Sequence, residues 1–269
     1  MKVIKESIGL LLLLIMIVGC SNDKEIVNGK LNVHLTDAPF PTDVVSKAMV
    51  TITKVEARRS GEVDGDPFMV LSDEEVDIDL LTLNNGLTAS LAEIDVPAGT
   101  YDLVRLYVTD AFIELNDGDS YSVKVPSGVQ TGIKVFISPG IEVAGGLTAD
   151  LLLDFDVSQS FVLQGPKNDP KGFLFKPTIK AANLSISGSL EGTVINELEQ
   201  PIEGAEVAVF AADTLNTTTF TGQNGNYTVL GLMPGSYSVV YSSQDLIPWT
   251  ADLVEIVVAN KTIVDVTLQ

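Results

Sequence analysis

Carboxylates are the main side chains of this sequence that could do chemistry. Asp154 and Asp156 lie two residues apart in a predicted strand, so both point away from the face that carries Leu153 and Phe155. Strand rise separates such a pair by roughly 6–7 Å, which would suit a glycosidase or a metal ion. No acid, nucleophile or substrate motif accompanies the pair. We therefore expect both aspartates to accept backbone hydrogen bonds or to end their strand, with metal binding as the alternative.

A second pair, Asp64 and Asp66, lies in the acidic segment 61–67 between two strand patterns. Alternating aspartates with glycine are typical of calcium loops, but the segment lacks the twelve-residue spacing and the closing glutamate of an EF-hand. A solvated hairpin turn is the favoured interpretation, as it is for residues 116–119. We predict no cofactor, with Ca²⁺ at these carboxylates as the alternative.

The other reactive residue types are scarce. His34 is the only histidine, and it lies on the polar face of a strand whose opposite face carries Leu31 and Leu35. A lone histidine forms neither a histidine-based metal cluster nor, without a motif around it, a Ser-His-Asp triad. Trp249 is the only tryptophan; we expect it to cover a domain core, with sugar stacking as the alternative. The chain is not predicted to be an enzyme.

Cys20, the only cysteine, follows a segment typical of export signals. Lysines precede an apolar run of about eleven residues, too short for the roughly 20 that span a membrane. Residues 17–20, Ile-Val-Gly-Cys, resemble the lipobox of bacterial lipoproteins, in which a peptidase cuts before a cysteine that carries lipid. The resemblance implies a signal peptide over 1–19, a lipidated Cys20 and a tether over 20–29. A plain signal peptide or a short anchor helix is the alternative.

The residues after Cys20 bear on localisation. Ser21 is similar to the residue that follows the cysteine in lipoproteins transferred to the outer membrane, and the acidic run 21–25 resembles surface-export signals of Bacteroidetes lipoproteins. The resemblance implies a protein that the lipid on Cys20 anchors in the outer membrane, so the membrane is its expected partner. It also implies exposure at the cell surface. A solvated linker is the alternative for 21–25.

Charge limits the partners. The formal net charge is −20, and removal of the signal peptide makes the chain more acidic still. Such a surface repels nucleic acid and anionic lipid headgroups, so no nucleic-acid partner is expected. Cations, neutral ligands such as glycans, or an envelope protein remain. Since the sole cysteine is taken by lipid, stability must come from burial and sheet hydrogen bonds.

From Lys30 onward the sequence alternates apolar and polar residues, which indicates half-buried strands with turns roughly every ten residues. Only 81–92 could be helical, and Asn84-Asn85-Gly86 breaks it. The fold class is therefore all-β, two tandem β-sandwich domains after a lipoprotein signal peptide. Strands are expected at 49–58, 76–80, 101–108, 111–115, 121–125, 132–137, 147–155 and 173–182.

Four landmarks of the first half resemble an uncharacterised lipoprotein domain, a domain of unknown function common in Bacteroidetes and other prokaryotes. They are residues 31–39, the turn Pro97-Ala98-Gly99-Thr100-Tyr101, residues 153–156 with Ser160, and Phe175-Lys176-Pro177. The resemblance covers 30–185 and implies placement without an established activity.

The second half, 187–269, resembles a carboxypeptidase regulatory-like domain. The similarity lies in Gly192-Thr193-Val194, in 201–207, in Gly225-Asn226-Tyr227, in 232–237 and in 264–268. It implies a transthyretin-like sandwich of seven strands with a carbohydrate-binding-like fold. Gly222 stands where the family often has Asp, so a cation or turn contact of that Asp is not expected. Lys261 is the only lysine here, and it lies in a predicted turn, so no isopeptide bond is expected.

Two smaller patterns belong to the second half. Its Pro234-Gly235-Ser236-Tyr237 turn is similar to the Pro97–Tyr101 turn, which indicates one turn solution used twice. Asp213-Thr214-Leu215 lies in a polar stretch between strands and resembles the O-glycosylation motif of exported Bacteroidetes proteins. Thr214 is thus a candidate modification site, with chance occurrence as the alternative.

These observations together favour a non-catalytic outer-membrane or cell-surface lipoprotein that acts as a binding module, for glycans or in adhesion. The alternative is a structural or accessory subunit of a cell-envelope complex. An exposed aromatic row would favour the first function, and an exposed apolar patch of several hundred Å² the second.

Overall fold

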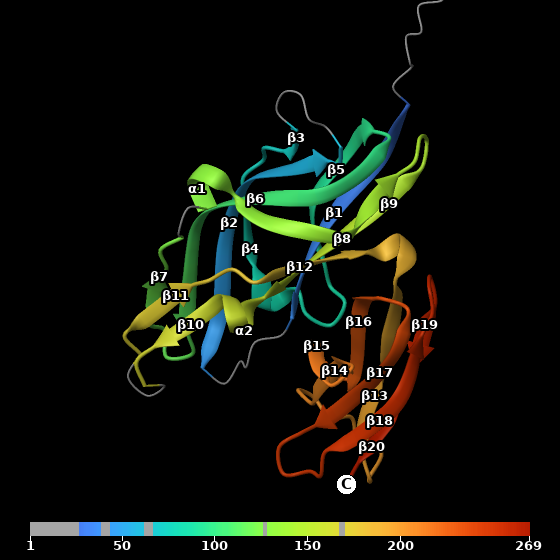
Figure 1. Ribbon diagram of the computed structural model, residues 1–269. Coiled ribbons are helices and arrows are strands. Elements are labelled where there is room, and N and C mark those ends of the chain that lie inside the picture. Colours follow the sequence, from blue (N-terminus) through green and yellow to red (C-terminus); the bar gives the residue numbers. More distant parts are fainter. Residues whose placement is uncertain (1–26, 39–43, 62–66, 126–127, 167–169) are drawn as a thin grey trace, which may run out of the picture.

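The computed structural model describes residues 27–38, 44–61, 67–125, 128–166 and 170–269. Cys20, the signal segment and the Asp64/Asp66 pair lie outside these residues. Within them the chain is all-β in tandem domains, as predicted (Figure 1). No helix in the described ranges is long and apolar enough to cross a membrane.

The first domain packs two main sheets face to face. One has the strand order β12-β9-β1-β5, and the other has the order β3-β2-β6-β7 with β4 also on β2 and β8 also on β6. Alternate residues of β1, Leu31, Val33 and Leu35, are fully buried between the sheets, as the period-two pattern predicts. The strands are β1 (Asn28–Ala38), β2 (Val45–Arg59), β3 (Phe68–Ser72), β4 (Val76–Asp79), β5 (Ala89–Pro97), β6 (Gly99–Leu115), β7 (Ser120–Ser122), β8 (Ile133–Val143), β9 (Thr148–Asp156) and β12 (Ile179–Asn183).

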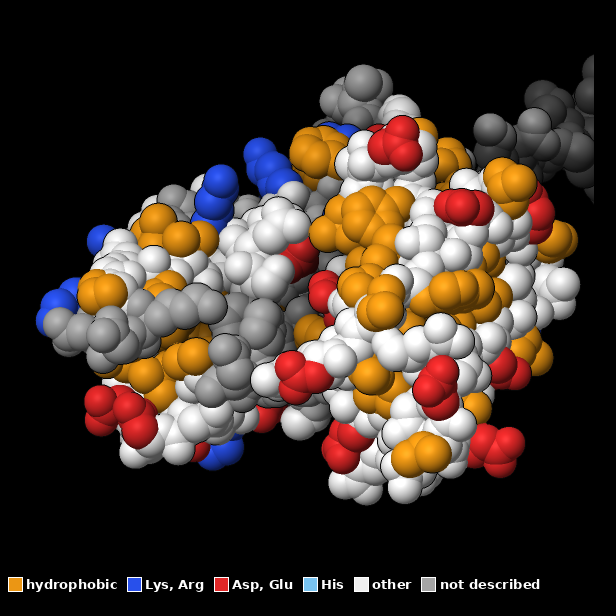
Figure 2. Space-filling view, turned by 90° about the horizontal axis from the view of Figure 1, so that it is seen from below, with side chains coloured by type: hydrophobic (Ala, Val, Ile, Leu, Met, Phe, Trp, Pro, Cys, Tyr) orange, Lys and Arg blue, Asp and Glu red, His pale blue; other side chains and the backbone are white. Residues whose placement is uncertain are grey.

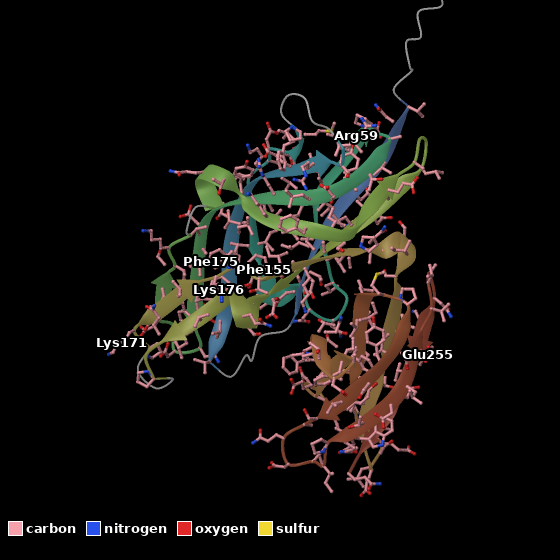
Figure 3. All side chains as sticks on the ribbon, viewed as in Figure 1. Arg59, Phe155, Lys171, Phe175, Lys176 and Glu255 are labelled. Atoms are coloured by element: carbon pink, nitrogen blue, oxygen red, sulfur yellow. The ribbon has the colours of Figure 1, made fainter. Side chains whose placement is uncertain are left out.

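Short elements complete this domain. Strands β10 (Phe161–Gln164) and β11 (Gly172–Phe175) form a separate two-stranded sheet. Its Phe175 attaches that sheet to the core, because the ring stacks on Phe155 of β9 with centroids 6.1 Å apart (Figure 3). The short helices are η1 (Leu80–Thr82), α1 (Gly128–Thr131), α2 (Val157–Ser160) and η2 (Leu184–Ile186).

The structure differs from the predicted elements in several places, of which three bear on the domain architecture. The segment 81–92 holds only part of η1 before β5 begins. The predicted strand 173–182 is divided into β11 and β12, since Pro177 cannot donate to a ladder. The predicted strands 101–108 and 111–115 are one strand, β6, whose pairing with β2 shifts register opposite Thr51 and Ile52.

The second domain is a smaller sandwich with its own core. One sheet has the order β16-β13-β19 with β20 also on β13, and the other has the order β15-β14-β17-β18. Both β19 and β20 pair parallel with β13, so they are two pieces of one closing strand and the seven-stranded expectation holds. The strands are β13 (Gly188–Asn196), β14 (Glu206–Ala211), β15 (Thr214–Phe220), β16 (Asn226–Leu232), β17 (Gly235–Ser242), β18 (Trp249–Ile256), β19 (Lys261–Ile263) and β20 (Val266–Leu268).

Buried tyrosines organise the turns and the second core. Tyr101 donates its hydroxyl to the Pro97 carbonyl and Tyr237 to that of Met233, each across four residues and at 2.8 Å. This is the tyrosine corner of β-sandwiches, and it appears once in each domain. Gly99 and Gly235 precede the two tyrosines at φ +155° and +154°, so the two turns share one solution, as predicted.

Each domain therefore buries its own cluster of apolar residues. In the second domain the hydroxyls of Tyr227 (β16) and Tyr241 (β17) lie 2.8 Å apart, and Tyr227 also donates to the Val264 carbonyl at 2.7 Å. These bonds join the two sheets through the core. The exact domain bounds, 30–185 and 187–269, stay a prediction.

Candidate binding cavity

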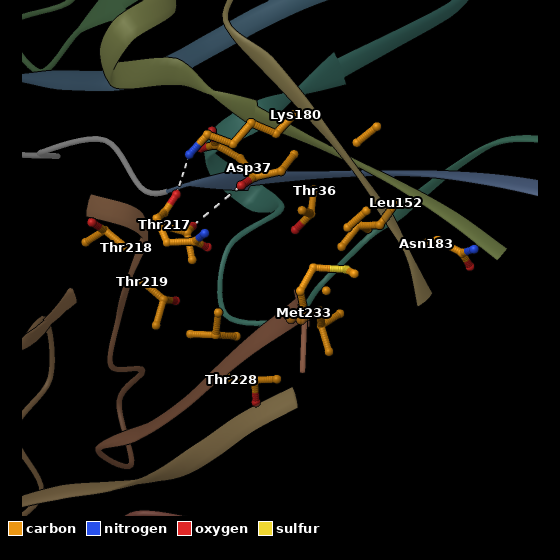
Figure 4. Close-up of a pocket in the computed structure, with 18 of the residues that line it drawn as sticks. Thr36, Asp37, Leu152, Lys180, Asn183, Thr217, Thr218, Thr219, Thr228 and Met233 are labelled. Carbon is orange, nitrogen blue, oxygen red and sulfur yellow. Dashed lines mark hydrogen bonds between the residues drawn. The ribbon is translucent and has the colours of Figure 1, made fainter. Parts of the chain in front are cut away.

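One hollow in the surface lies where the two domains meet. A cavity of about 160 Å³ is bounded by the end of β1, the 84–87 loop, β9 and β12 of the first domain, and by β15 and β16 of the second (Figure 4). β15 and β16 are edge strands of the two different sheets of the second sandwich. The open side of that sandwich therefore faces the first domain.

Direct contacts hold the domains together around this cavity. Asn85 Nδ2 donates to the Asn226 carbonyl at 3.2 Å, and the Lys180 ammonium donates to the Asn216 carbonyl. Thr217 Oγ1 donates to Asp154 Oδ2 at 3.5 Å. Each of these bonds crosses from one domain to the other, so the cavity walls are tied to one another.

Glycines permit part of this close approach. A Cβ added to Gly231 of β16 would lie 2.8 Å from Ala182 Cβ of β12, and one added to Gly86 would lie 2.8 Å from Thr228 Cγ2. Real Cβ atoms essentially never come so close. The backbone of each domain therefore touches the other where a side chain would hold them apart.

Three buried acceptor atoms line the cavity without a hydrogen-bond partner in the described part of the chain. They are Asp37 Oδ2, Asn85 Oδ1 and Thr219 Oγ1. The side chains of Asp37 and Thr219 are only 5% and 4% exposed. A buried polar atom left unpaired costs about 1–3 kcal/mol. Such atoms cluster where water or a ligand completes the hydrogen bonding.

Asp37 has an unusual electrostatic environment. Burial raises the pKa of its carboxyl well above the usual value, although the Val157 N–H, which donates to Oδ1 at 3.1 Å, acts in the opposite direction. The nearby charges of Asp154, Asp156 and Asp79 raise the pKa further. The second oxygen of Asp37 therefore favours a hydrogen-bond donor or a proton.

The structure separates the roles of the two predicted strand aspartates. Asp154 lines the cavity, whereas Asp156 ends β9 and caps α2. Asp156 Oδ1 accepts from the Gln159 N–H at 3.0 Å and from Ser158 Oγ at 2.7 Å, and Oδ2 accepts from Gln159 Nε2 at 2.7 Å. Asp156 thus has the structural role given above. No group of three or more His, Cys, Asp or Glu that could hold a metal occurs in the described residues.

The other candidates lie apart from the cavity. His34 Nε2 is 3.5 Å from Asp150 Oδ1 on the first domain. Trp249 begins β18, packs against the Tyr241 ring with centroids 5.7 Å apart, and remains 44% exposed. Thr214 is exposed directly after a two-residue turn, but it begins a strand, β15, whereas a polar loop was expected.

The cavity residues other than Asp154 were not predicted as a site. Asp37 falls within the landmark 31–39, and Asn85 within the Asn84-Asn85-Gly86 break, but neither is a site residue on sequence grounds. Their approach to Thr219 depends on packing between domains, for which the sequence carries no local signal. A buried Asp at a strand end is the one feature that could have drawn attention to this position.

Apolar side chains are exposed on the side of the second domain away from this cavity. Leu253, Val257 and Ile263, here named the apolar edge, are 79%, 55% and 65% exposed. They lie on β18, β19 and the turn between them. Figure 2 shows several orange areas on the second domain, broken by acidic side chains.

Comparison with protein families accounts for both halves of the chain. The model of the family described as Domain of unknown function (DUF4382) matches residues 28–177. The chain belongs to this family. The model of the carboxypeptidase regulatory-like domain matches residues 189–269. A domain of unknown function followed by a carboxypeptidase regulatory-like domain is therefore confirmed. No curated protein matches the chain.

Three of the solved structures that resemble this DUF4382 protein are distant from it in sequence. The Bacillus anthracis TIE protein is 9% identical with a TM-score of 0.25, over 90% of this chain and 34% of that one. The shaft pilin SpaA of Lactobacillus rhamnosus GG is 8% identical with a TM-score of 0.28, over 90% and 98%. BcpA, the major pilin subunit of Bacillus cereus, is 11% identical with a TM-score of 0.24, over 90% and 70%. The chain spans about a third of the TIE protein, and likenesses at this level carry no argument about function.

Proposed function

We propose that this protein is a non-catalytic lipoprotein, anchored in the outer membrane through Cys20 and exposed at the cell surface, that acts as a binding module for glycans or in adhesion. The observation that carries the proposal is the cavity between the domains, in which Asp37, Asn85 and Thr219 present unpaired acceptors. The strongly acidic chain repels anionic ligands, and the unpaired acceptors of the cavity need hydrogen-bond donors. Neutral ligands rich in hydroxyl groups meet both conditions.

A glycan array probed with purified residues 21–269 tests this function. We expect binding to a restricted set of glycans, because a cavity of fixed shape selects among ring substituents. Heat-denatured protein at equal concentration is the control for nonspecific adsorption. Binding no stronger than that of the control across the array would contradict glycan binding.

A second function, an accessory subunit of an envelope complex, is favoured by the apolar edge. Leu253, Val257 and Ile263 are exposed apolar side chains that a partner protein could cover. Cross-linking in native membranes would test it with Leu253→Asp as the variant. Leu147→Asp is the matched control, since Leu147 is 64% exposed on the first domain. Loss of a cross-linked species in the first variant alone would support the subunit role, and equal cross-linking in both would contradict it.

A further inference from the structure

We propose that the cavity between the two domains binds one neutral saccharide unit through its hydroxyl groups, with Asp37, Asn85 and Thr219 as acceptors. The inference rests on the proposed binding function and assigns a site and a ligand class to it. The three atoms belong to β1, the 84–87 loop and β15, so the site exists only where the domains are docked.

The ligand class follows from what the unpaired atoms can do. The Asn85 amide oxygen only accepts hydrogen bonds, Asp37 Oδ2 accepts them when the carboxyl is ionised, and the Thr219 hydroxyl can accept or donate. A ligand that satisfies Asp37 Oδ2 and Asn85 Oδ1 must therefore bring donors. Saccharide hydroxyls are donors that are also able to accept from the threonine side chains Thr218 and Thr228, which line the same wall.

The size and the walls fit a single ring. A volume of about 160 Å³ has room for several water molecules, since one water needs only about 10–15 Å³ of such space. It therefore has room for one small ring. Aliphatic side chains, including Ile137, Leu152 and Val229, line part of the wall and can meet the C–H face of a sugar. None of the lining residues is aromatic, so hydrogen bonds and aliphatic contacts must supply the affinity.

The charges around the cavity favour a neutral saccharide over an anion or a divalent cation. Asp37 and Asp154 repel anions, while the Lys180 ammonium is engaged with the Asn216 carbonyl. A divalent cation is disfavoured because no group of three acidic or histidine ligands occurs among the described residues. Neutral hydroxyls satisfy the acceptors without requiring a third carboxylate.

Thr219→Val is the decisive variant. It removes a buried, unpaired hydroxyl while retaining the side-chain shape, so the sugar-free protein should be at least as stable as the wild type. The same change removes a ligand contact. Thr214→Val is the matched control, because Thr214 is exposed at the other end of the same strand. Asp37→Asn is a second variant, in which the amide oxygen can still accept from the Val157 N–H.

The experiment uses residues 21–269 and titrates methyl glycosides of glucose, galactose, mannose and N-acetylglucosamine by ligand-observed NMR. Free glucosamine, whose amine is a cation, and CaCl₂ are titrated separately to test whether the site takes a cation instead. We expect at least one neutral glycoside to bind the wild type and Thr214→Val equally, and tenfold or more weaker binding to Thr219→Val and Asp37→Asn. Thermal unfolding without sugar checks that Thr219→Val is not destabilised.

Three results would overturn the assignment. The first is that no neutral glycoside binds the wild type. The second is that Thr219→Val binds as well as the wild type does. The third is that the wild type binds glucosamine or Ca²⁺ but none of the neutral glycosides. Glycan-array binding that persists in Thr219→Val would place the glycan site elsewhere, so this inference would fail while the proposed function stands. An array without signal would remove both.

Discussion

Docking of the two domains depends on Gly231, which makes Gly231→Ala an informative perturbation. Gly231 has φ +73°, where an L-residue costs about 1–2 kcal/mol. Its new Cβ would also lie 2.8 Å from Ala182 Cβ and 3.3 Å from Leu152 Cδ2 of the first domain. Ala182 Cβ cannot rotate away, so the domains must separate. We expect a loss of about 1–2 kcal/mol in the second domain and loosened docking.

Gly204→Ala is the matched control. Gly204 has the same φ, +73°, lies in the same domain, and has no atom within 4 Å of an added Cβ. The control should therefore lose the same 1–2 kcal/mol or so through backbone strain, with the domains still docked. The difference between the two variants isolates the contact with Ala182.

Two measurements separate the effects. Urea unfolding followed by Trp249 fluorescence reports the second domain, since this tryptophan is the only one in the chain and packs on Tyr241. Small-angle X-ray scattering of the folded protein reports docking. Equal scattering profiles for both variants would refute the interface argument, and an unchanged unfolding midpoint in Gly204→Ala would refute the strain argument.

Four further predictions follow from the sequence and the fold. Cys20→Ser should abolish lipidation and membrane retention; labelling by a palmitate analogue at the wild-type level in the membrane fraction would contradict this. The fragment 187–269 should unfold cooperatively by circular dichroism because it has its own core, whereas a disordered fragment would indicate one fused domain. Native protein should carry a glycan on Thr214, which Thr214→Ala removes without unfolding; an unmodified peptide in the mass spectrum would reject it. Because burial raises the folded-state pKa of Asp37 above its unfolded value of about 3.9, wild-type stability should fall relative to Asp37→Asn as pH rises from about 4. Identical pH profiles of the two proteins, measured by urea unfolding, would contradict this linkage.

Local pattern was enough to predict most of the strands and the two tyrosine turns of this chain. The alternation at Leu31, Val33 and Leu35 gave β1 its buried face, and the two Pro-Gly-Tyr turns carried the tyrosine corners. The same pattern cannot say which strands pair. β1 pairs parallel with β9, more than a hundred residues later, and nothing in either strand specifies its neighbour.

Strand β15 shows where the pattern fails. Thr217-Thr218-Thr219 has no apolar alternation, so a polar loop was expected. The segment is a strand because β14 supplies its hydrogen-bond partners, and its other edge is left to the domain junction. Its threonines supply polar groups to the wall of the cavity, since Thr217, Thr218 and Thr219 all line it. The residues that misled the prediction are therefore the ones most relevant to binding.

The short connection between the domains explains how such a cavity can be maintained. β12 runs through the three residues of η2 and Ser187 directly into β13, so little chain is available for a wide hinge. Contacts at Asn85, Lys180 and Gly231 then fix the remaining freedom. Neither domain alone contains all three unpaired acceptors, because Asp37 and Asn85 come from the first and Thr219 from the second. Binding at this site is thus a property of the docked pair, and loosening the domains should weaken it even where every acceptor is intact.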